Sequence, residues 1–281
     1  MTDYETRFAG ITRLYGTDGL RRLRAAHVCI VGIGGVGCWT VEALARSGVG
    51  KLTLIDLDEV CVSNMNRQLH ALDNSVGRPK VSVMAERIRE INPECEIQAA
   101  QEFFTAETEA RLLTTRYDFV VDAIDNVLNK CLLIACCRER NMPTVVCGGA
   151  GGRRDGTLVR VADLAHATHD RLLRSVRDLL RKDFGFPRGD KKLGVDCVFS
   201  PEPPVFPNMD GSVCAQRPEM NRAGNEEPLR LNCNWGLGSA TYVTGAFGFA
   251  AAGLVVRRLA EPGNSQTSEE AEKIHLRLSG E

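Results

Sequence analysis

The chain has 281 residues, of which 43% are hydrophobic, and a formal net charge of -1. This length is enough for one large or two modest hydrophobic cores, and the balanced charge excludes a globally basic surface for nucleic acid. The eleven cysteines are irregularly spaced, and the polar start MTDYETR is neither a secretory signal nor an arginine-rich transit peptide. We therefore expect a reduced, cytoplasmic protein without a disulfide framework.

After a helical lead over residues 1–26, the chain carries a glycine-rich turn between a strand and a helix. The apolar run Val28–Val31 predicts a buried strand, and Trp39–Arg46 has a helical pattern. Between them, Gly32, Gly34 and Gly37 have GxGxxG spacing. Backbone amides at the start of such a helix can bind an anion, so the turn predicts a phosphate site.

A second strand, Leu52–Ile55, ends at Asp56. This carboxylate follows the glycines by roughly 20 residues, where dinucleotide-binding folds place the acceptor for a ribose hydroxyl. Strand, glycine turn, helix, strand and carboxylate in this order predict a mononucleotide-binding βαβ unit. The alternative for Asp56 is a strand-end carboxylate without a ligand.

Two cationic side chains follow in the next segment. Arg67 lies in the run Ser-Asn-Met-Asn-Arg-Gln, and Lys80 follows Pro79 at the start of a helical pattern that reaches about Arg89. Attack on the α-phosphate of ATP needs such groups, because fixed cations stabilise the charge that grows on the phosphate oxygens. We also expect free amides at this helix start to face an anion. The alternative is that both cations are solvated surface charges.

A third strand delivers carboxylates to the same edge of the predicted sheet. The run Tyr117–Asp122 is mostly apolar, and Asp125 follows it by three residues. Mg²⁺ bridges one or two carboxylates to substrate phosphates, so we predict that Asp125 is a magnesium ligand. The alternative is that Asp122 or Asp125 caps a helix that starts at Val127.

Four motifs now stand in order: GIGGVG, LIDLDEVCVSNMNRQ, GRPK and DAIDN. From Arg7 to about Gly152 the chain resembles the ubiquitin-activating-enzyme-like superfamily, which includes the molybdopterin and thiamine adenylyltransferases. Further runs, among them RFAGITRLYG, GGAGG, KLGVDCVFSPE, DGSVCA and LNCNWGLGSAT, resemble one branch, the tRNA threonylcarbamoyladenosine dehydratases. The second set extends the resemblance to nearly the full length.

The resemblance implies an α/β fold with a Rossmann-like, mostly parallel sheet, and a homodimer. It also implies ATP and Mg²⁺ as cofactors, with nucleotide contacts from Gly32, Gly34, Gly35, Gly37, Asp56, Asp58, Asn64, Arg67, Lys80 and Asp125. The substrate would be tRNA that carries threonylcarbamoyladenosine, whose threonyl carboxylate is adenylated and then closed into a ring by its own carbamoyl group. A monovalent cation and a sulfurtransferase partner stay open.

Two departures from the superfamily concern cysteine and arginine. The molybdopterin and thiamine branches hold zinc with two CxxC pairs, which this sequence lacks, so we predict no structural zinc. Those relatives also carry an arginine that reaches the partner's ATP site, and either Arg7 or Arg13 could serve here. Cys233 lies where the superfamily often keeps a thioester cysteine and could capture the acyl group. Direct cyclisation without a covalent enzyme intermediate is the alternative.

Beyond the adenylation core at 27–152, we expect a less regular substrate and dimerisation region at 153–260 and a polar tail at 261–281. Basic residues recur at helical spacing on one predicted helix and could grip tRNA phosphates, or form a solvated helix face: Arg171, Arg174, Arg177, Arg181 and Lys182. Residues 236–256 are uncharged and about long enough to span a bilayer. Their richness in Gly, Ala, Ser and Thr favours a buried helix over a membrane anchor.

Three other functions compete with the dehydratase hypothesis. An activating enzyme for a sulfur-carrier or ubiquitin-like protein would share the adenylation site, but it usually has the zinc ribbon. A non-catalytic scaffold would be expected to have lost the charged residues of the site. An NAD oxidoreductase fits the glycine spacing, but it would give no function to Asn64, Asn66, Arg67 and Lys80.

Overall fold

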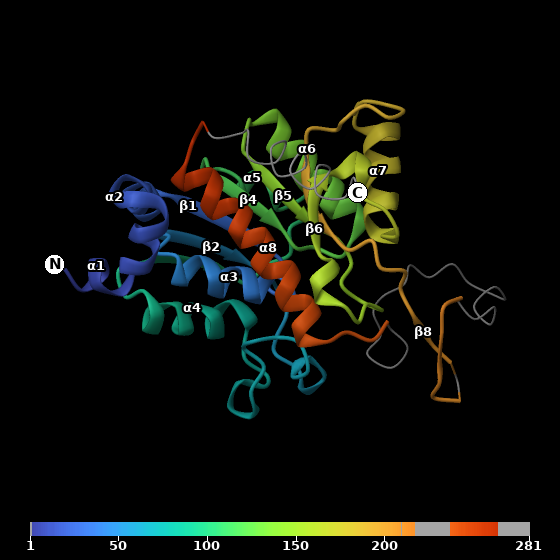
Figure 1. The fold of residues 1–281 in the computed structure, drawn as a ribbon, viewed down its shortest axis with the longest axis horizontal. Coiled ribbons are helices and arrows are strands. Elements are labelled where there is room, and N and C mark those ends of the chain that lie inside the picture. Colours follow the sequence, from blue (N-terminus) through green and yellow to red (C-terminus); the bar gives the residue numbers. More distant parts are fainter. Residues whose placement is uncertain (1, 209, 217–236, 264–281) are drawn as a thin grey trace, which may run out of the picture.

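The computed structural model describes residues 2–208, 210–216 and 237–263 (Figure 1). Its centre is a seven-stranded sheet in the order β3-β2-β1-β4-β5-β7-β6, in which only the β6–β7 pairing is antiparallel. The strands are β1 His27–Val31, β2 Lys51–Ile55, β3 Glu96–Ala100, β4 Phe119–Asp122, β5 Thr144–Cys147, β6 Arg160–Asp163 and β7 Asp196–Phe199. The predicted Rossmann-like, mostly parallel sheet is confirmed.

The strand order places a topological switch point between β1 and β4. From β1 the chain moves outward through β2 to β3, then returns to pair β4 against the other side of β1. Open α/β sheets bind ligands at such a point, outside the carboxyl ends of the strands. The glycine turn follows β1 and the DAIDN motif follows β4, so both meet at this edge.

Helices cover both faces of the sheet. They are α1 Asp3–Arg7, α2 Ala9–Ala25, α3 Gly37–Arg46, α4 Lys80–Ile91, α5 Glu109–Leu112, α6 Val127–Glu139, α7 Arg171–Asp183 and α8 Thr241–Ala260. Short 3-10 turns occupy Val62–Asn64, Asp73–Ser75, Gly156–Leu158 and Leu164–His166, and a small hairpin pairs β8 Phe206–Pro207 with β9 Val213–Cys214. The helical lead is confirmed as α1 and α2.

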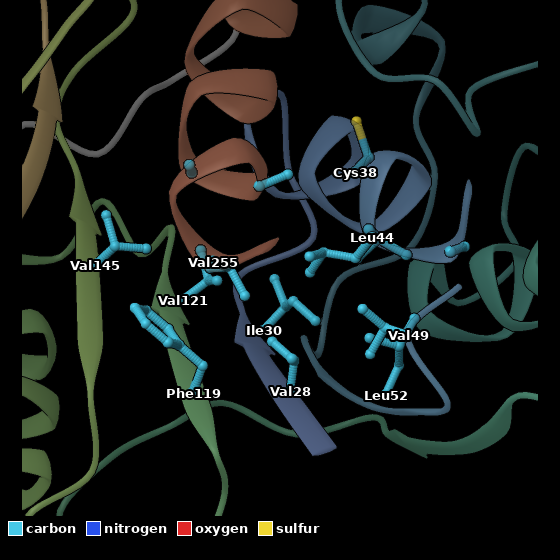
Figure 2. Close-up of a cluster of buried hydrophobic side chains, with 14 of the residues drawn as sticks. Val28, Ile30, Cys38, Leu44, Val49, Leu52, Phe119, Val121, Val145 and Val255 are labelled. Carbon is cyan, nitrogen blue, oxygen red and sulfur yellow. The ribbon is translucent and has the colours of Figure 1, made fainter. Parts of the chain in front are cut away.

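Strand β1 shows why this sequence forms a central strand. All of its residues are buried, and successive side chains point to opposite faces. Val28 and Ile30 join the cluster that α3 and α8 cover, where Leu44 and Val255 lie nearby (Figure 2). Cys29 and Val31 belong to the cluster on the other face, with α6. Burying one such aliphatic side chain contributes about 1.5–3 kcal/mol.

Helix α8 lies beside α3 on the sheet (Figure 1). It is the helix among the described residues that is long and apolar enough to cross a membrane by length and composition, and most of it is buried within the protein. The predicted buried helix is therefore confirmed, although it begins at Thr241 because Ala240 is still extended. Small residues on α8 allow its backbone to approach α3 closely.

Candidate active site

Glycines allow the turn after β1 to lie close to its neighbours. Gly32 has a φ of +91°, and a Cβ on it would lie 2.7 Å from the carbonyl oxygen of Ala123. A Cβ on Gly37 would lie 1.8 Å from the carbonyl oxygen of Gly32. These two glycines therefore serve the backbone geometry that brings β1, α3 and the end of β4 together.

The middle of the turn has space beside its backbone for a phosphate group. A Cβ on Gly34 would meet nothing within 4 Å. The amides of Gly34, Gly35, Val36 and Gly37 donate to no acceptor within the described parts of the chain, whereas the Cys38 amide already bonds to the Gly34 carbonyl. Four unused donors at the start of a helix fit the phosphates of a nucleotide.

Asp56 lies at the carboxyl end of β2 and is 8% exposed. One carboxylate oxygen accepts the Ile33 amide at 2.6 Å, and the other accepts the Asp58 amide at 2.8 Å. Burial raises the pKa of Asp56, while Lys80 and the two amides act in the opposite direction. The carboxylate therefore fixes the glycine turn relative to β2, and its position beside the turn is compatible with a ribose contact.

Lys80 lies at the first turn of α4 and is 5% exposed. Its Nζ lies 2.8 Å from a carboxylate oxygen of Asp58. The prediction of free amides at this helix start was wrong for most of the turn, because the Lys80 amide donates to the Asp58 carbonyl and the Ser82 and Val83 amides donate to the Pro79 carbonyl. The side chain of Lys80, rather than the helix start, supplies positive charge here.

Arg67 lies against the glycine turn. Its Cγ would be 3.5 Å from a Cβ on Gly35. Its Nη1 donates to the Ser63 carbonyl at 2.6 Å and to the side-chain oxygen of Asn66 at 3.0 Å. Asn64, which is buried, accepts the Cys61 amide at 3.0 Å and so holds the turn that carries Arg67.

The two acidic residues at the end of β4, Asp122 and Asp125, have different surroundings. Asp125 is exposed, and the cap of α6 is Asn126, whose side chain accepts the Asn129 amide at 3.1 Å. The capping alternative for Asp125 is therefore wrong. Asp122 instead forms an ion pair with Lys130 at 2.7 Å, in which neither side chain is exposed. Sequence reasoning missed this pair, although one lysine on the otherwise apolar stretch of α6 was a usable signal.

A second glycine-rich loop, Gly148–Gly152, follows β5 next to the end of β4. The Gly149 amide donates to Asp170 at 2.8 Å, and Nε of Arg153 donates to the Gly149 carbonyl at 3.0 Å. Arg153 also donates to the carbonyls of His169 and Glu202. Arg153 and Asp170 are both buried and went unnoticed in the sequence, because the contacts of Arg153 with Glu202 and of Asp170 with Gly149 join segments far apart in the chain.

The predicted basic helix is confirmed as α7, but two of its arginines already donate hydrogen bonds to backbone carbonyls. Arg177 donates to the carbonyls of Leu164 and Ala167, and Arg181 donates to those of Pro187 and Gly189. The exposed cations that remain on this helix are Arg171, Arg174 and Lys182.

The cysteine predicted to capture the acyl group, Cys233, lies outside the described residues. Within them, most cysteines are buried, and burial raises the pKa of thiols such as Cys95 and Cys147 to about 12. No group of three or more His, Cys, Asp or Glu side chains in the described segments is arranged to hold a metal ion.

The chain is similar to known proteins over nearly its full length. Residues 6–276 match the ThiF family. The tRNA threonylcarbamoyladenosine dehydratase of Escherichia coli (strain K12) is 49% identical over 257 residues, which cover 91% of this chain and 94% of that protein. A solved structure of TcdA (CsdL) has a TM-score of 0.83 at 46% identity, and that of the E. coli dehydratase in complex with ATP has 0.80 at 44%. Each match covers 92% of this chain and 96% of the solved one. The chain belongs to the ThiF family and, within it, to the tRNA threonylcarbamoyladenosine dehydratases.

Proposed function

We propose that the chain catalyses the ATP-dependent dehydration of threonylcarbamoyladenosine in tRNA by adenylating the threonyl carboxylate. The observation that carries this proposal is the set of four glycine-turn amides without an acceptor among the described residues, with Arg67 against the turn and Lys80 close enough to act on Asp56, which accepts the Ile33 amide. The solved E. coli dehydratases in complex with ATP and with AMP support ATP as the nucleotide.

In the first step, a carboxylate oxygen of the threonyl group attacks the α-phosphorus of ATP. The bond to the bridging oxygen breaks, pyrophosphate leaves, and an acyl adenylate forms. Arg67 and Lys80 stabilise the negative charge that develops on the phosphate oxygens, and the amides of the turn hold the phosphates in place. Asp56 accepts a ribose hydroxyl, while Asp58 and Asn64 keep Lys80 and the Arg67 turn in position.

In the second step, the carbamoyl group of the same side chain attacks the activated carbonyl carbon. The bond between this carbon and the AMP oxygen breaks, and the carbamoyl group loses a proton as the ring closes. The net change in the nucleoside is the loss of one water, which ATP hydrolysis to AMP and pyrophosphate makes favourable. Ring closure is intramolecular, so the protein mainly orients the side chain and excludes water.

Asp125 is the proposed protein ligand for Mg²⁺ that accompanies ATP. Its carboxylate is exposed at the edge where the phosphates would lie, and a single carboxylate suffices when phosphate oxygens complete the coordination. Mg²⁺ would neutralise phosphate charge. A monovalent cation and a sulfurtransferase partner are not needed for the proposed reaction.

The region 153–260 would supply the tRNA side of the site and, through α8, part of the contact between two copies. Both arginines proposed to act in trans are exposed, but Arg7 pairs with Asp3 and donates to the Ile91 carbonyl, whereas Arg13 forms no ion pair or hydrogen bond with the described residues. We therefore favour Arg13 for that role. The exposed basic residues of α7 would contact tRNA phosphates.

The direct test incubates the protein with ATP, Mg²⁺ and tRNA that carries threonylcarbamoyladenosine, and measures the mass of the nucleoside after digestion. Loss of one water, with one AMP released per converted nucleoside, is expected. Arg67→Ala should lower the rate by about 10²–10³-fold, whereas Arg89→Ala, at the far end of α4, should change it less than twofold. An unchanged nucleoside mass, or AMP release that requires an added sulfur-carrier protein, would favour the activating-enzyme alternative.

The covalent route through Cys233 is tested separately. Cys233→Ala removes the thiol, so the step from adenylate to thioester becomes impossible. Undiminished turnover would establish direct cyclisation, and loss of both product and AMP release with pyrophosphate release retained would establish the thioester, because the thiol is the group that expels AMP on that route.

A further inference from the structure

The start of α8 is joined to the turn that carries Arg67. Thr241 Oγ1 donates to the Asn66 carbonyl at 2.7 Å, and the side-chain amide of Asn66 donates in return to the Ser239 carbonyl at 2.7 Å. Residues 237–244, which we call the bridge, therefore hold the backbone directly before Arg67. These contacts join parts of the chain more than 170 residues apart.

The carbonyl of Arg67 itself receives two further donors. Nε1 of Trp39 on α3 donates to it at 3.1 Å, and Thr244 Oγ1 of the bridge donates at 3.3 Å. The Thr244 hydroxyl also lies 3.3 Å from the Thr241 carbonyl, so it shares its hydrogen between two acceptors. The Trp39 N–H donates to the Arg67 carbonyl alone. The backbone of Arg67 is thus fixed from α3 and from α8 at once.

The other side of the bridge contacts the loop Gly148–Gly152. The Gly152 amide donates to the Gly238 carbonyl at 2.7 Å, and a Cβ on Gly151 would lie 3.0 Å from Cβ of Leu237. The bridge therefore spans the distance between the Arg67 turn and the loop that follows β5. Both segments border the carboxyl edge of the sheet.

Close packing of α8 on α3 makes these contacts possible. A Cβ on Gly248 would lie 2.7 Å from Cβ of Trp39 and 2.7 Å from the Val36 carbonyl. Only a residue without a side chain allows the helices to approach this far, and this approach brings Thr244 to the Arg67 carbonyl. A Cγ2 atom of Thr244 would also lie 3.3 Å from a Cβ on Gly35, in the glycine turn.

We infer that Trp39, Thr241 and Thr244 are positioning residues for Arg67, which hold its backbone so that its side chain stays against the glycine turn, where Cγ would lie 3.5 Å from a Cβ on Gly35. The inference rests on the proposed function in one respect, namely that Arg67 stabilises the phosphates. A cationic side chain stabilises a transition state only when it is held in the matching position. If its backbone is free to shift, the side chain leaves that position, and bringing it back costs free energy.

The test uses two variants that remove one donor each. Trp39→Phe keeps the ring and loses the indole N–H, and Thr241→Val keeps the shape of an exposed side chain and loses the hydroxyl. Each should lower kcat for AMP formation by about 3- to 10-fold with little change in KM for ATP. Thr241→Ser should restore the rate. The matched control is Thr40→Val, because Thr40 joins α3 to the Gly248 carbonyl on α8 without touching the Arg67 turn.

Two further measurements decide how these residues act. In an Arg67→Ala background, Trp39→Phe should cause no further loss of AMP formation; an unchanged 3- to 10-fold loss would overturn the inference. Hydrogen exchange of the peptide covering residues 63–70 should become faster in Trp39→Phe and Thr241→Val but not in Thr40→Val. This second result does not depend on the reaction. A wild-type protein that leaves the nucleoside mass unchanged refutes the proposed function, while unaltered exchange in both variants refutes the positioning role.

Discussion

At the scale of single residues, Asp56, Lys80 and Asp122 are buried ionisable groups at the carboxyl edge of the sheet, and each is compensated differently. Asp56 accepts two backbone amides, Lys80 faces the half-exposed carboxylate of Asp58, and Asp122 faces Lys130 in full burial. The first two groups keep a route to solvent or ligand. The third has none, and its role is to join β4 to α6.

Removing one partner of the Asp122–Lys130 pair should be strongly destabilising. Lys130→Met leaves a carboxylate in an interior with no exposed surface, and one of its oxygens, Oδ2, already has no hydrogen-bond partner among the described residues. We expect the free energy of unfolding in urea to fall by about 3–5 kcal/mol. The double variant Asp122→Leu with Lys130→Met should recover much of this loss, and a double variant as unstable as the single one would contradict the account.

His70 should make stability depend on pH. Burial, together with Lys80, lowers the pKa of His70 to about 4 from its ordinary 6.5. The unfolded chain takes up a proton below about pH 6.5 that the folded chain refuses until about pH 4, so stability falls as the pH is lowered across this interval. The loss should be on the order of 3 kcal/mol, measured by urea unfolding at several pH values.

The control for His70 separates this side chain from general acid effects. His70→Leu should remove most of the pH-dependent loss, whereas His166→Gln, at an exposed histidine, should leave it in place. Equal pH dependence in His70→Leu and the unaltered protein would show that other groups are responsible.

Sequence reasoning reached the glycine turn, Arg67, Lys80 and Asp125 because each stands at a recognisable offset from a strand or helix end. It did not reach Trp39 or Arg153, since the Arg67 partner of Trp39 lies 28 residues away and the Glu202 partner of Arg153 lies 49 residues away. Such contacts depend on how elements pack, and local spacing does not encode them. At the start of α4, the predicted free amide of Lys80 is occupied for the same reason, because it donates to the carbonyl of Asp58, 22 residues earlier.

At the scale of elements, the contact between α3 and α8 decides where the bridge lies. Gly248→Ala would place a methyl group 2.7 Å from Cβ of Trp39 and from the Val36 carbonyl, so the helices must separate. We expect a loss of about 1–3 kcal/mol in the free energy of unfolding, with a slower reaction because the bridge moves with α8.

Gly253→Ala provides the matched control on the same helix. A Cβ there meets nothing within 4 Å, so the higher helix propensity of alanine should stabilise the protein by up to about 1 kcal/mol. If both alanine variants shifted stability in the same direction, packing between α3 and α8 would not be the deciding factor.

The elements themselves were largely predictable, because buried strands and amphipathic helices leave regular patterns. Strand β1, strand β2 and helix α7 were found this way. The start of α8 was placed at residue 236 instead of 241, since glycine, alanine and serine before Thr241 continue the apolar composition although the backbone at Ala240 is extended.

At the scale of the whole molecule, an apolar face between α2, α3 and α8 is left uncovered by the described residues. A cavity of about 240 Å³ on this face is lined by residues such as Ile11, Tyr15 and Val256. Leu14, which is 72% exposed, and Phe249, which is 51% exposed, add apolar surface there. Exposed apolar patches often mark contacts between proteins, which agrees with the proposed homodimer.

Sedimentation velocity tests this face as the dimer contact. We expect a dimer for the unaltered protein and a shift of at least tenfold toward monomer for Leu14→Asp, because a charge would be buried without a partner. Leu128→Asp is the control, since Leu128 is also exposed but lies on α6. A Leu14→Asp protein that dimerises like the control would place the contact elsewhere.

The central claim is that amides of the glycine turn, Arg67 and Lys80 together hold the phosphates of ATP at the switch point of the sheet. A crystal structure with a non-hydrolysable ATP analogue and Mg²⁺ tests it most directly. The account predicts phosphate oxygens within hydrogen-bond distance of the Gly34–Gly37 amides and of both cationic side chains. A triphosphate bound elsewhere, or both cations turned away from it, would contradict the account.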